Sequence, residues 1–391
     1  MKEALIITTV SGFLLKFELE NVKLLQSLGY RVHYAANKND QHYYFSEDQL
    51  TQLGVEFHHI DIARSPYMLS WNFRALKELL KIIREHNISL IHCHTPVGGA
   101  LGRIAAALIS DEKIRVIYTA HGFHFYHGAP LVNNTIYYLA ERLLARFTDS
   151  LVVINKEDYE SASHFHLKPG GRLWQIPGIG IDTDTFRAAN PAERNDNRKK
   201  HGIGEDHFLL LSVGELNENK NHSAILSAIQ LLKEQHLLPS NLRYGICGDG
   251  FLGEKLNQIV LDYGLQDVVY LFGYCTDVRN YLCMADAVAF PSMREGLGMA
   301  ALEALSMGIP VLAADNRGTR EYMHPGENGF VCKWSDIKQF STELLQLYEM
   351  PQEELVQMQR KCRDSVAAFS RENARVIMKT IYQEIDRKLM E

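Results

Sequence analysis

The sequence is poor in the features that mark secreted and membrane-spanning proteins. Its six cysteines are scattered over 391 residues without a Cys-x-x-Cys pair, so we expect buried thiols rather than disulfides or zinc ligands. No apolar run approaches the roughly 18 residues that span a bilayer. The short run at the start is interrupted by Thr8 and Thr9, which favours a first β-strand over a signal peptide. We therefore expect a cytoplasmic protein that can lie peripherally against the cytoplasmic membrane face.

The sequence also lacks an excess of basic residues. Lysine and arginine number 41 against 47 aspartates and glutamates, which gives a net charge of −6. Duplex binding needs a basic face, so we expect no nucleic-acid partner. The apolar content of 46% and charged content of 23% are those of a globular protein. Because single cores stop growing at roughly 250–300 residues, we expect two domains.

Short apolar runs alternate with amphipathic stretches along the whole chain. In the first half the pattern predicts strands at 4–9, 31–36, 90–92, 115–119 and 151–154, and helices at 18–28, 73–86 and 98–109. In the second half it predicts strands at 208–213, 244–247, 268–272, 287–290 and 311–313, and helices at 223–234, 252–263, 277–284 and 298–307. This order predicts an α/β protein with parallel sheets covered by helices on both faces.

A polar stretch without periodicity, at residues 180–197, separates the two halves. We place an N-terminal Rossmann-like domain at residues 1–185 and a C-terminal one at residues 186–370. The amphipathic helix expected at 371–391 would pack back on the N-terminal domain. Ligands of open parallel sheets bind beyond the carboxyl ends of the strands. Two such domains, with their sheets facing an interdomain cleft, make that cleft the expected site.

The segment at 291–315, PSMREGLGMAALEALSMGIPVLAAD, carries the strongest chemical signal. A strand leads into a loop where Gly296 and Gly298 allow close backbone approach, and the helix that follows offers N–H groups to an anion. Glu295 lies in the loop and Glu303 on the helix, where both can face one ligand. Carboxylates accept hydrogen bonds from hydroxyl pairs. The segment therefore favours a ligand with phosphate and sugar over a structural turn with solvated glutamates.

The two glutamates, followed by Gly-x-Pro-Val, resemble glycosyltransferase family 4, which has the GT-B fold. SVGELNENKNH at 212–222 is similar to the phosphate-binding loop of that family, and GDG at 248–250 and LFGYCTDV at 271–278 are similar to its nucleobase-side loops. IHCHTPVGGALGR at 91–103 and YTAHGFHFYHGAP at 118–130 resemble a narrower group, the EpsD-like transferases of exopolysaccharide and capsule assembly. The ordered set, over essentially the full chain, is more specific than any one piece.

The resemblance implies a role for each matching position. Glu295 would hold hydroxyls of the donor sugar, Glu303 would hold the ribose hydroxyls, and Lys220 would neutralise the diphosphate as a flexible point charge. His121 would stand next to the anomeric carbon of the donor, and His94 is a weaker candidate for the same site. The backbone expected to line the donor comprises Gly12, Gly214, Gly248, Gly296, Leu297, Gly298 and Met299, with the N–H groups of 296–299 on the diphosphate.

One position departs from the family pattern. The usual loop has an arginine directly after its glycine, where this chain has Glu215. A carboxylate repels a nearby diphosphate. We therefore expect Glu215 either to point away or to pair with a compensating cation, Arg294 or Arg317, and we favour the pairing.

A metal site is a competing interpretation, because 12 of the 17 histidines precede residue 185. The histidines near predicted strand ends are His92, His94, His121, His124 and His127. Their spacings are loose, and no Asp-x-Asp motif stands directly after a predicted strand, so we expect no metal. His121 directly follows a predicted strand and precedes Gly122, which favours a site role over a packed structural one.

The sequence gives little information about where the acceptor binds. The aromatic-rich segment at 121–147 ends in a predicted helix that carries Arg142 and Arg146. This segment is either part of the core, which we favour, or an apolar groove for a lipid-linked acceptor with the arginines near headgroups or a pyrophosphate.

Together these features predict a retaining glycosyltransferase that needs no metal or other cofactor. It would move a hexose or N-acetylhexosamine from a UDP-sugar to an undecaprenyl-diphosphate-linked saccharide of a bacterial exopolysaccharide, capsule or O-antigen. Retention is what the resemblance implies. Two alternatives stay open, a UDP-N-acetylglucosamine 2-epimerase and an inactive nucleotide-sugar-binding partner subunit.

Overall fold

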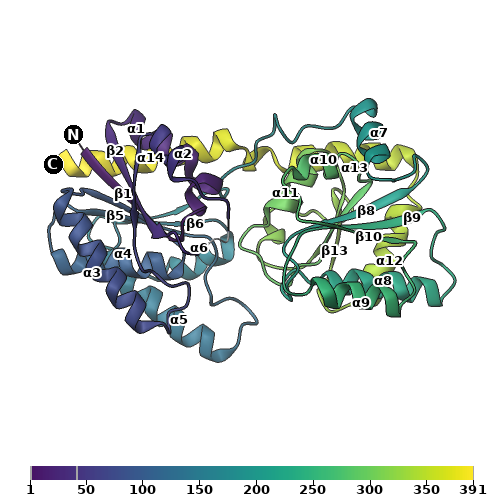
Figure 1. Cartoon of the computed structure of the whole chain (residues 1–391), viewed down its shortest axis with the longest axis horizontal. Helices are drawn as coiled ribbons and strands as arrows, with labels where there is room; N and C mark the ends of the chain where they lie inside the picture. Colours follow the sequence, from purple (N-terminus) through teal and green to yellow (C-terminus); the bar gives the residue numbers. More distant parts are fainter. Residues whose placement is uncertain (1, 41–42, 391) are drawn as a thin grey trace. The chain divides into compact units, whose positions relative to one another are not determined.

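The computed structural model describes residues 2–40 and 43–390, and the chain folds into two compact units (Figure 1). Unit 1 comprises residues 1–180 and 372–391, and unit 2 comprises residues 181–371. The units divide at 180/181 rather than at 185/186, because Ile181 is bound to the end of unit 2. It forms a β-bridge with Ser370, and its carbonyl oxygen accepts the N–H of Arg371 at 2.8 Å.

Unit 1 contains one parallel sheet of seven strands in the order β3-β2-β1-β4-β5-β6-β7. The strands are β1 (Lys2–Val10), β2 (Tyr30–Asn37), β3 (Val55–His59), β4 (Leu90–His94), β5 (Arg115–Ala120), β6 (Ser150–Val153) and β7 (Arg172–Gln175). The helices are α1 (Leu19–Ser27), α2 (Glu47–Gln52), α3 (Leu69–Glu85), α4 (Pro96–Ile109), α5 (Leu131–Leu144), α6 (Lys156–Ala162) and α14 (Arg371–Met390), and a π-helical turn (Leu14–Glu18) precedes α1. The central strands are buried on both faces, as is usual for a parallel sheet.

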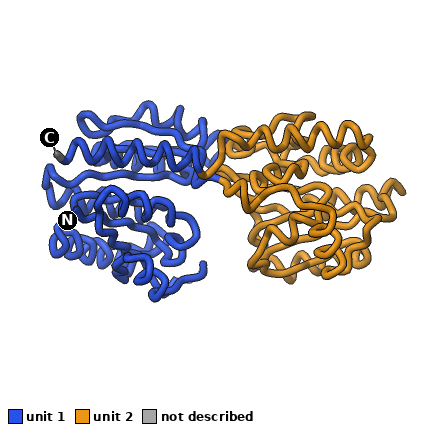
Figure 2. Tube along the Cα trace, turned by 90° about the horizontal axis from the view of Figure 1, so that it is seen from above, with its two compact units in different colours: residues 1–180, 372–391 blue, residues 181–371 orange. Residues whose placement is uncertain are grey.

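The last helix, α14, packs on the sheet of unit 1 although it is distant in sequence (Figure 2). Asp386 accepts Lys2 Nζ at 2.6 Å and the Tyr30 hydroxyl at 2.8 Å. The buried Tyr382 hydroxyl lies 2.8 Å from His92 Nδ1 on β4. The last helix therefore packs on the same sheet that contains the first strand.

Unit 2 repeats the plan with six parallel strands in the order β10-β9-β8-β11-β12-β13. The strands are β8 (Phe208–Val213), β9 (Leu242–Cys247), β10 (Val269–Gly273), β11 (Ala287–Phe290), β12 (Val311–Ala314) and β13 (Gly329–Cys332). The helices are α7 (Pro191–Lys200), α8 (His222–Glu234), α9 (Gly253–Asp262), α10 (Val278–Leu282), α11 (Met299–Ser306), α12 (Ile337–Tyr348) and α13 (Gln352–Ser365). In Figure 1, α8, α9 and α12 cover one face of the sheet, and α10, α11 and α13 cover the other.

The two sheets share a reversal of strand order, and this reversal positions the candidate site. In unit 1 the order reverses between β1 and β4, and in unit 2 it reverses between β8 and β11. At such a switch point the two flanking loops leave in opposite directions and open a crevice at the carboxyl ends of the strands. In each unit, a ligand is therefore expected at the carboxyl ends of the two strands that flank the reversal.

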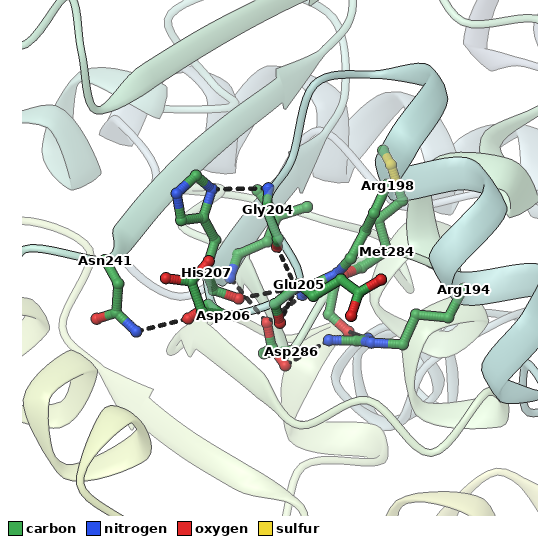
Figure 3. A network of polar contacts seen from close by, with 11 residues as sticks. Arg194, Arg198, Gly204, Glu205, Asp206, His207, Asn241, Met284 and Asp286 are labelled. Atoms are coloured by element: carbon green, nitrogen blue, oxygen red, sulfur yellow. Dashed lines mark hydrogen bonds and ion pairs between the residues drawn. The ribbon is translucent and has the colours of Figure 1, made fainter.

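At the amino ends of the central strands of unit 2, an ion pair joins α7 to the sheet (Figure 3). Arg198 of α7 is buried, and its Nη2 donates to Asp286 Oδ2 at 2.6 Å. Its other N–H groups donate to the carbonyl oxygens of Met284, Gly204, Glu205 and His207. Asp286 also accepts Arg194 at 2.6 Å and the N–H of Leu209 at 2.8 Å. This network ties α7 to the amino ends of β8 and β11.

Five of the six cysteines are buried, and Cys275 is half-buried. Within the described part of the chain, no helix combines the length and the apolar character needed to cross a bilayer.

Candidate active site

An ion pair stands at the switch point of unit 2. Lys220 comes from the loop after β8, Glu295 comes from the loop after β11, and Lys220 Nζ lies 2.6 Å from Glu295 Oε1. The Lys220 side chain is 23% exposed and that of Glu295 is 14% exposed, so both can reach a ligand. Lys220 Nζ also lies 5.4 Å from the centroid of the Phe290 ring. The two side chains to which we gave separate donor roles are therefore in contact.

The loop that carries Glu295 is fixed from both sides. From the loop after β8, Asn219 Nδ2 donates to the Arg294 oxygen at 2.9 Å, and the Asn219 oxygen accepts the N–H of Met293 at 2.8 Å. From the loop after β12, the buried Asn316 donates to the Ser292 oxygen at 2.9 Å. Because the loop is held by its backbone, the Glu295 carboxylate is presented in one place.

The helix that follows, α11, begins where the loop ends. Gly298 caps it with φ +96°, a left-handed conformation that disfavours side chains. A Cβ here would also lie 2.8 Å from the Phe290 ring and 2.9 Å from the Tyr322 hydroxyl. The first turn of a helix has N–H groups without intrahelical acceptors, and these suit an anion. Glu303 is half-buried on the same helix, in the middle of its sequence.

Two further glycines have packing reasons for being glycine. A Cβ on Gly248 would lie 1.8 Å from the Gly214 oxygen, so the turn after β9 can approach the turn after β8 only without a side chain. A Cβ on Gly214 would lie 3.1 Å from Lys220 Cδ. Both residues thus shape the loop that carries Lys220. Their contact with a nucleotide stays a prediction.

The expected ion pair of Glu215 with Arg294 or Arg317 is not formed. Glu215 is exposed, and no ion pair of its carboxylate is found within residues 2–40 and 43–390. The side chain of the next residue, Leu216, is buried instead, and the backbone of Leu216 lies against Gly250. Arg317 is buried, and its Nε donates to the Glu295 oxygen at 3.3 Å. This arginine therefore supports the loop rather than compensating Glu215.

The switch point of unit 1 gathers histidines. His94 ends β4 and His121 follows β5, and His94 Nδ1 lies 3.1 Å from His121 Nε2. Phe13, after β1, packs against both rings, with centroid separations of 5.7 and 5.3 Å. Gly12 lies beside the backbone of Tyr43, where a Cβ would come within 2.6 Å of the Tyr43 oxygen. The structure thus brings His94 and His121 together and gives Gly12 a packing role.

Burial keeps this group uncharged at neutral pH. It lowers the pKa of His121 to about 4 and that of His92 to about 3, and it lowers the pKa of His94 well below its usual value. The buried Glu18, whose Oε1 lies 3.4 Å from His94 Nδ1, has its pKa raised by burial to about 8. His121 is therefore a neutral hydrogen-bonding group rather than a cation.

Glu18, His92 and His94 could in principle hold a metal, because their ligand atoms lie within 4.8 Å of one another. However, His92 already uses both ring nitrogens, with the Tyr382 hydroxyl at 2.8 Å from Nδ1 and the Thr119 hydroxyl at 2.8 Å from Nε2. This group is better described as a hydrogen-bonded support for His94 and His121.

The sequence did not point to several of these supporting residues. Asn219 and Asn316 hold the Glu295 loop, and Glu18 touches His94. The signal for the two asparagines was weak but present, since each follows a strand within a few residues. Glu18 opens an amphipathic stretch in which a surface position is the ordinary expectation.

The architecture defines the class of protein. Two units with Rossmann-like parallel sheets form the GT-B fold of glycosyltransferases, and solved structures share it. HepE of Anabaena, solved with UDP-glucose, has a TM-score of 0.77 at 16% identity over 98% of this chain and 100% of that chain. Sucrose-phosphate synthase of Thermosynechococcus elongatus has a TM-score of 0.80 at 16% identity over 99% and 100% of the two chains.

Sequence comparison gives the family. Residues 193–365 match the family described as glycosyl transferases group 1, and residues 3–155 match glycosyl transferase 4-like proteins. EpsD, provisionally assigned as a glycosyltransferase of Bacillus subtilis (strain 168), is 39% identical over 90% of this chain and 88% of its own length. The UDP-Gal:alpha-D-GlcNAc-diphosphoundecaprenol alpha-1,3-galactosyltransferase of Escherichia coli is 28% identical over 75% of each chain. The chain belongs to the group 1 glycosyltransferases and is an enzyme of that class.

Proposed function

We propose that this glycosyltransferase moves a hexose or N-acetylhexosamine from a UDP-sugar to an undecaprenyl-diphosphate-linked saccharide during synthesis of a bacterial exopolysaccharide, capsule or O-antigen, with retention at the anomeric carbon. The names of EpsD and of the Escherichia coli galactosyltransferase support this setting. HepE, which shares the fold, has been solved with UDP and with UDP-glucose.

The observation that carries the proposal is the Lys220–Glu295 pair beside the start of α11. An ammonium group has three N–H donors, and within the described chain Lys220 Nζ donates to Glu295 alone. Its other donors are available to an anion. In this proposal the diphosphate lies between Lys220 and the N–H groups of 296–299, Glu295 turns to the sugar hydroxyls, and Glu303 binds the ribose.

These groups fit a transfer without a protein nucleophile. As the bond between sugar and diphosphate breaks, Lys220 and the loop N–H groups would stabilise the charge that develops on the leaving oxygens. The diphosphate would accept the proton of the incoming hydroxyl. His121, which is neutral, would orient the donor or acceptor by a hydrogen bond. We propose that this chemistry needs no divalent metal.

The surface of α5 supports a lipid-linked acceptor. None of its residues is buried, and Val132, Ile136, Leu139 and Leu143 follow one another at spacings of four, three and four residues, which places them on one face. Leu131 is 84% exposed at the start of the same helix, and Arg142 and Arg146 are exposed at its end. An apolar stripe flanked by arginines suits the boundary between acyl chains and anionic headgroups.

A transfer assay tests the proposal as a whole. The chain is incubated in EDTA at 25 °C with a panel of UDP-sugars and a diphosphate-linked lipid saccharide, and the product is analysed by NMR. We expect transfer from one UDP-sugar with the donor anomeric configuration retained. Activity that is lost in EDTA and restored by Mn²⁺ would contradict metal independence. Conversion of UDP-N-acetylglucosamine without any acceptor would identify an epimerase instead.

The two glutamates separate sugar binding from nucleotide binding. Glu303→Ala should weaken binding of UDP itself, whereas Glu295→Ala should lower transfer more than it lowers UDP affinity. Calorimetric titration of UDP and initial transfer rates measure the two effects. Equal UDP affinities for the wild type and Glu303→Ala would remove the ribose assignment.

The α5 stripe can be tested apart from the donor site. Ile136→Asp with Leu139→Asp should abolish sedimentation with vesicles that contain anionic lipid, and should leave UDP affinity unchanged. Thr135→Asp, a polar position of the same helix, is the matched control. Vesicle binding equal to the wild type in the double variant would contradict this acceptor-side proposal.

A further inference from the structure

Four metal-ligating side chains meet at the edge of the unit 1 sheet, away from the candidate active site. They are His33 of β2, Glu56 and His58 of β3, and His86, which ends α3. His33 and Glu56 are partners in the register of β2 and β3, and His58 lies two residues further along β3. We propose that these four residues bind one divalent transition-metal ion, with Zn²⁺ the expected occupant.

The ligand atoms converge on one point. His33 Nδ1 and His58 Nε2 are 2.9 Å apart, and Glu56 Oε1 lies 3.8 Å from His58 Nε2 and 3.9 Å from His86 Nε2. All four ligand atoms lie within 4.8 Å of one another. A tetrahedral Zn²⁺ with bonds of about 2.0–2.1 Å places its ligand atoms roughly 3.4 Å apart. Side-chain rotations that move the outer atoms by roughly an ångström therefore complete the geometry.

The surrounding charges support the four ligands. Glu3 Oε2 lies 2.9 Å from His33 Nε2, the nitrogen that would face away from the metal. A carboxylate in that position fixes the ring orientation of a metal-bound histidine and raises its basicity. Arg31 Nη2 binds Glu56 Oε2 at 2.6 Å and leaves Oε1 to the metal. The two carboxylates and one guanidinium leave a net negative charge for a cation.

The ligand set indicates which ion fits. Three imidazoles and one carboxylate oxygen, without a thiolate, suit Zn²⁺, Co²⁺, Ni²⁺ or Cu²⁺ better than Mg²⁺ or Ca²⁺, which prefer oxygen ligands. Four protein ligands close a tetrahedral shell, so the site has no open position for a substrate. The bound ion would therefore be structural.

The location agrees with a structural role. β3 is the edge strand of the sheet, and His86 belongs to the end of α3. A metal held by both would join the edge strand β3 to the end of α3. His33 lies in the middle of β2, and Glu56 and His58 lie along β3, whereas His94 and His121 stand at the carboxyl ends of β4 and β5 on the other side of β1. Loss of this metal should thus lower the stability of unit 1 without displacing the candidate active-site residues His94 and His121.

The experiment uses the full chain after chelation and dialysis. Zn²⁺ is titrated by calorimetry into the wild type and into His58→Ala/His86→Ala, whose two side chains are partly exposed. The wild type should bind one more equivalent of Zn²⁺ than the double variant. At a hundredfold excess over Kd, Zn²⁺ should raise the Tm of the wild type by about 5 °C or more, and this rise should be lost in the double variant.

His59→Ala is the matched control, because His59 is the next residue on β3 and is not one of the four ligands. It should keep both the extra equivalent and the Tm rise. Glu56→Gln preserves shape and should weaken Zn²⁺ binding at least tenfold, which keeps the test valid should the double variant fold poorly. Co²⁺ gives a second readout, since a four-coordinate site produces strong visible absorption that the variants should lose.

Equal stoichiometry and equal Tm rise in the wild type and His58→Ala/His86→Ala would overturn the proposal, as would loss of both effects in His59→Ala. The double variant should transfer sugar at 25 °C within about twofold of the wild type, because the site lies outside the transfer machinery. The metal proposal and the proposed function can therefore fail separately.

Discussion

Two of the ion pairs in unit 2 lie at opposite ends of the strands of one sheet, here called the amino and carboxyl edges, and they differ in how many of their hydrogen-bond donors are used. At the amino edge, Arg198 is buried and donates to Asp286 and to four carbonyl oxygens. At the carboxyl edge, Lys220 donates from its ammonium group to Glu295 alone within the described chain, and both side chains are partly exposed. We call the first pair saturated, because every N–H group of the Arg198 guanidinium donates a hydrogen bond. In the second pair, Lys220 keeps N–H donors that can bind a ligand.

The difference separates a structural pair from a candidate binding pair. A buried charge is tolerated only when its hydrogen bonds are complete, so Arg198 has nothing left for a ligand. A cation with unused donors beside a helix start can exchange its carboxylate partner for an anion at low cost. Residue type alone does not distinguish the two pairs, because each joins a basic to an acidic side chain. Their positions differ, since Asp286 precedes a strand, whereas Lys220 and Glu295 follow strands.

Breaking the saturated pair should have the largest effect. Arg198→Ala removes the hydrogen bond to Asp286 and leaves four carbonyl oxygens without this donor, and it should destabilise unit 2 by about 3–5 kcal/mol, as measured by urea unfolding. Arg194→Ala is the control, because Arg194 binds the same carboxylate but is more exposed. It should cost about 1 kcal/mol or less. Similar losses for the two variants would contradict the saturated-pair account.

Breaking the other pair should affect binding more than folding. Lys220→Ala should weaken UDP binding about ten- to a hundredfold, since a charge-assisted contact contributes about 1.5–3 kcal/mol. The affinity for uridine should hardly change, because uridine carries no diphosphate. The unfolding free energy should fall far less than in Arg198→Ala. Calorimetry with both ligands checks this, and equal losses for UDP and uridine would place the lysine elsewhere.

The histidines of unit 1 extend the comparison to buried groups that are kept neutral. With folded pKa values depressed from about 6.5, to about 3 for His92 and about 4 for His121, their contribution is complete above pH 6.5 and is lost as the pH falls toward 4. Glu18, whose folded pKa is raised to about 8, has the opposite sign and lowers stability as the pH rises from about 4.5 to 8.

The contribution of these buried groups to the stability of unit 1 should therefore be greatest near pH 6.5. Below it, we expect a loss of at least about 1.4 kcal/mol per pH unit, because the histidines together outweigh Glu18. Glu18→Gln should reduce the fall of the unfolding free energy above pH 6.5. His92→Asn should reduce its slope below pH 6.5 by the contribution of one proton. Urea unfolding at a series of pH values measures both, and an unchanged profile in both variants would refute the burial argument.

The smallest effect concerns the exposed Glu215. With no ion pair to break, Glu215→Arg should tighten UDP binding by no more than about fivefold, which corresponds to the value of a surface charge contact. Glu218→Arg, an exposed position of the same loop, is the control and should change affinity less. A marked loss of UDP affinity in Glu215→Arg would show that this carboxylate supports the loop after all.

Periodicity was enough to predict the two parallel sheets, because the central strands are buried on both faces and are mostly apolar. The edge strands β3, β7 and β13 were missed, since VEFHH and RLWQ are short and mix polar with aromatic residues, and GFVC has only four residues. The positions of Lys220 and Glu295 after strands were correct. Their roles toward a donor stay predictions.

Contacts between distant segments could not be read from the sequence. Asn316 was not distinguishable from any loop asparagine until its hydrogen bond to Ser292 was seen. The histidine cluster of β2, β3 and α3 has no motif spacing, because two of its elements are joined by sheet register and the third is the end of a helix. Glu215 shows the converse error, since a missing family arginine suggested an ion pair that the local turn does not form.

The most direct test of the central claim is a crystal structure of the chain with UDP. We predict that the diphosphate contacts Lys220 Nζ and the backbone N–H groups of 296–299, that the ribose hydroxyls bind Glu303, and that the Arg198–Asp286 pair is unchanged. A nucleotide bound with its diphosphate away from the loops that follow β8 and β11 would contradict the account.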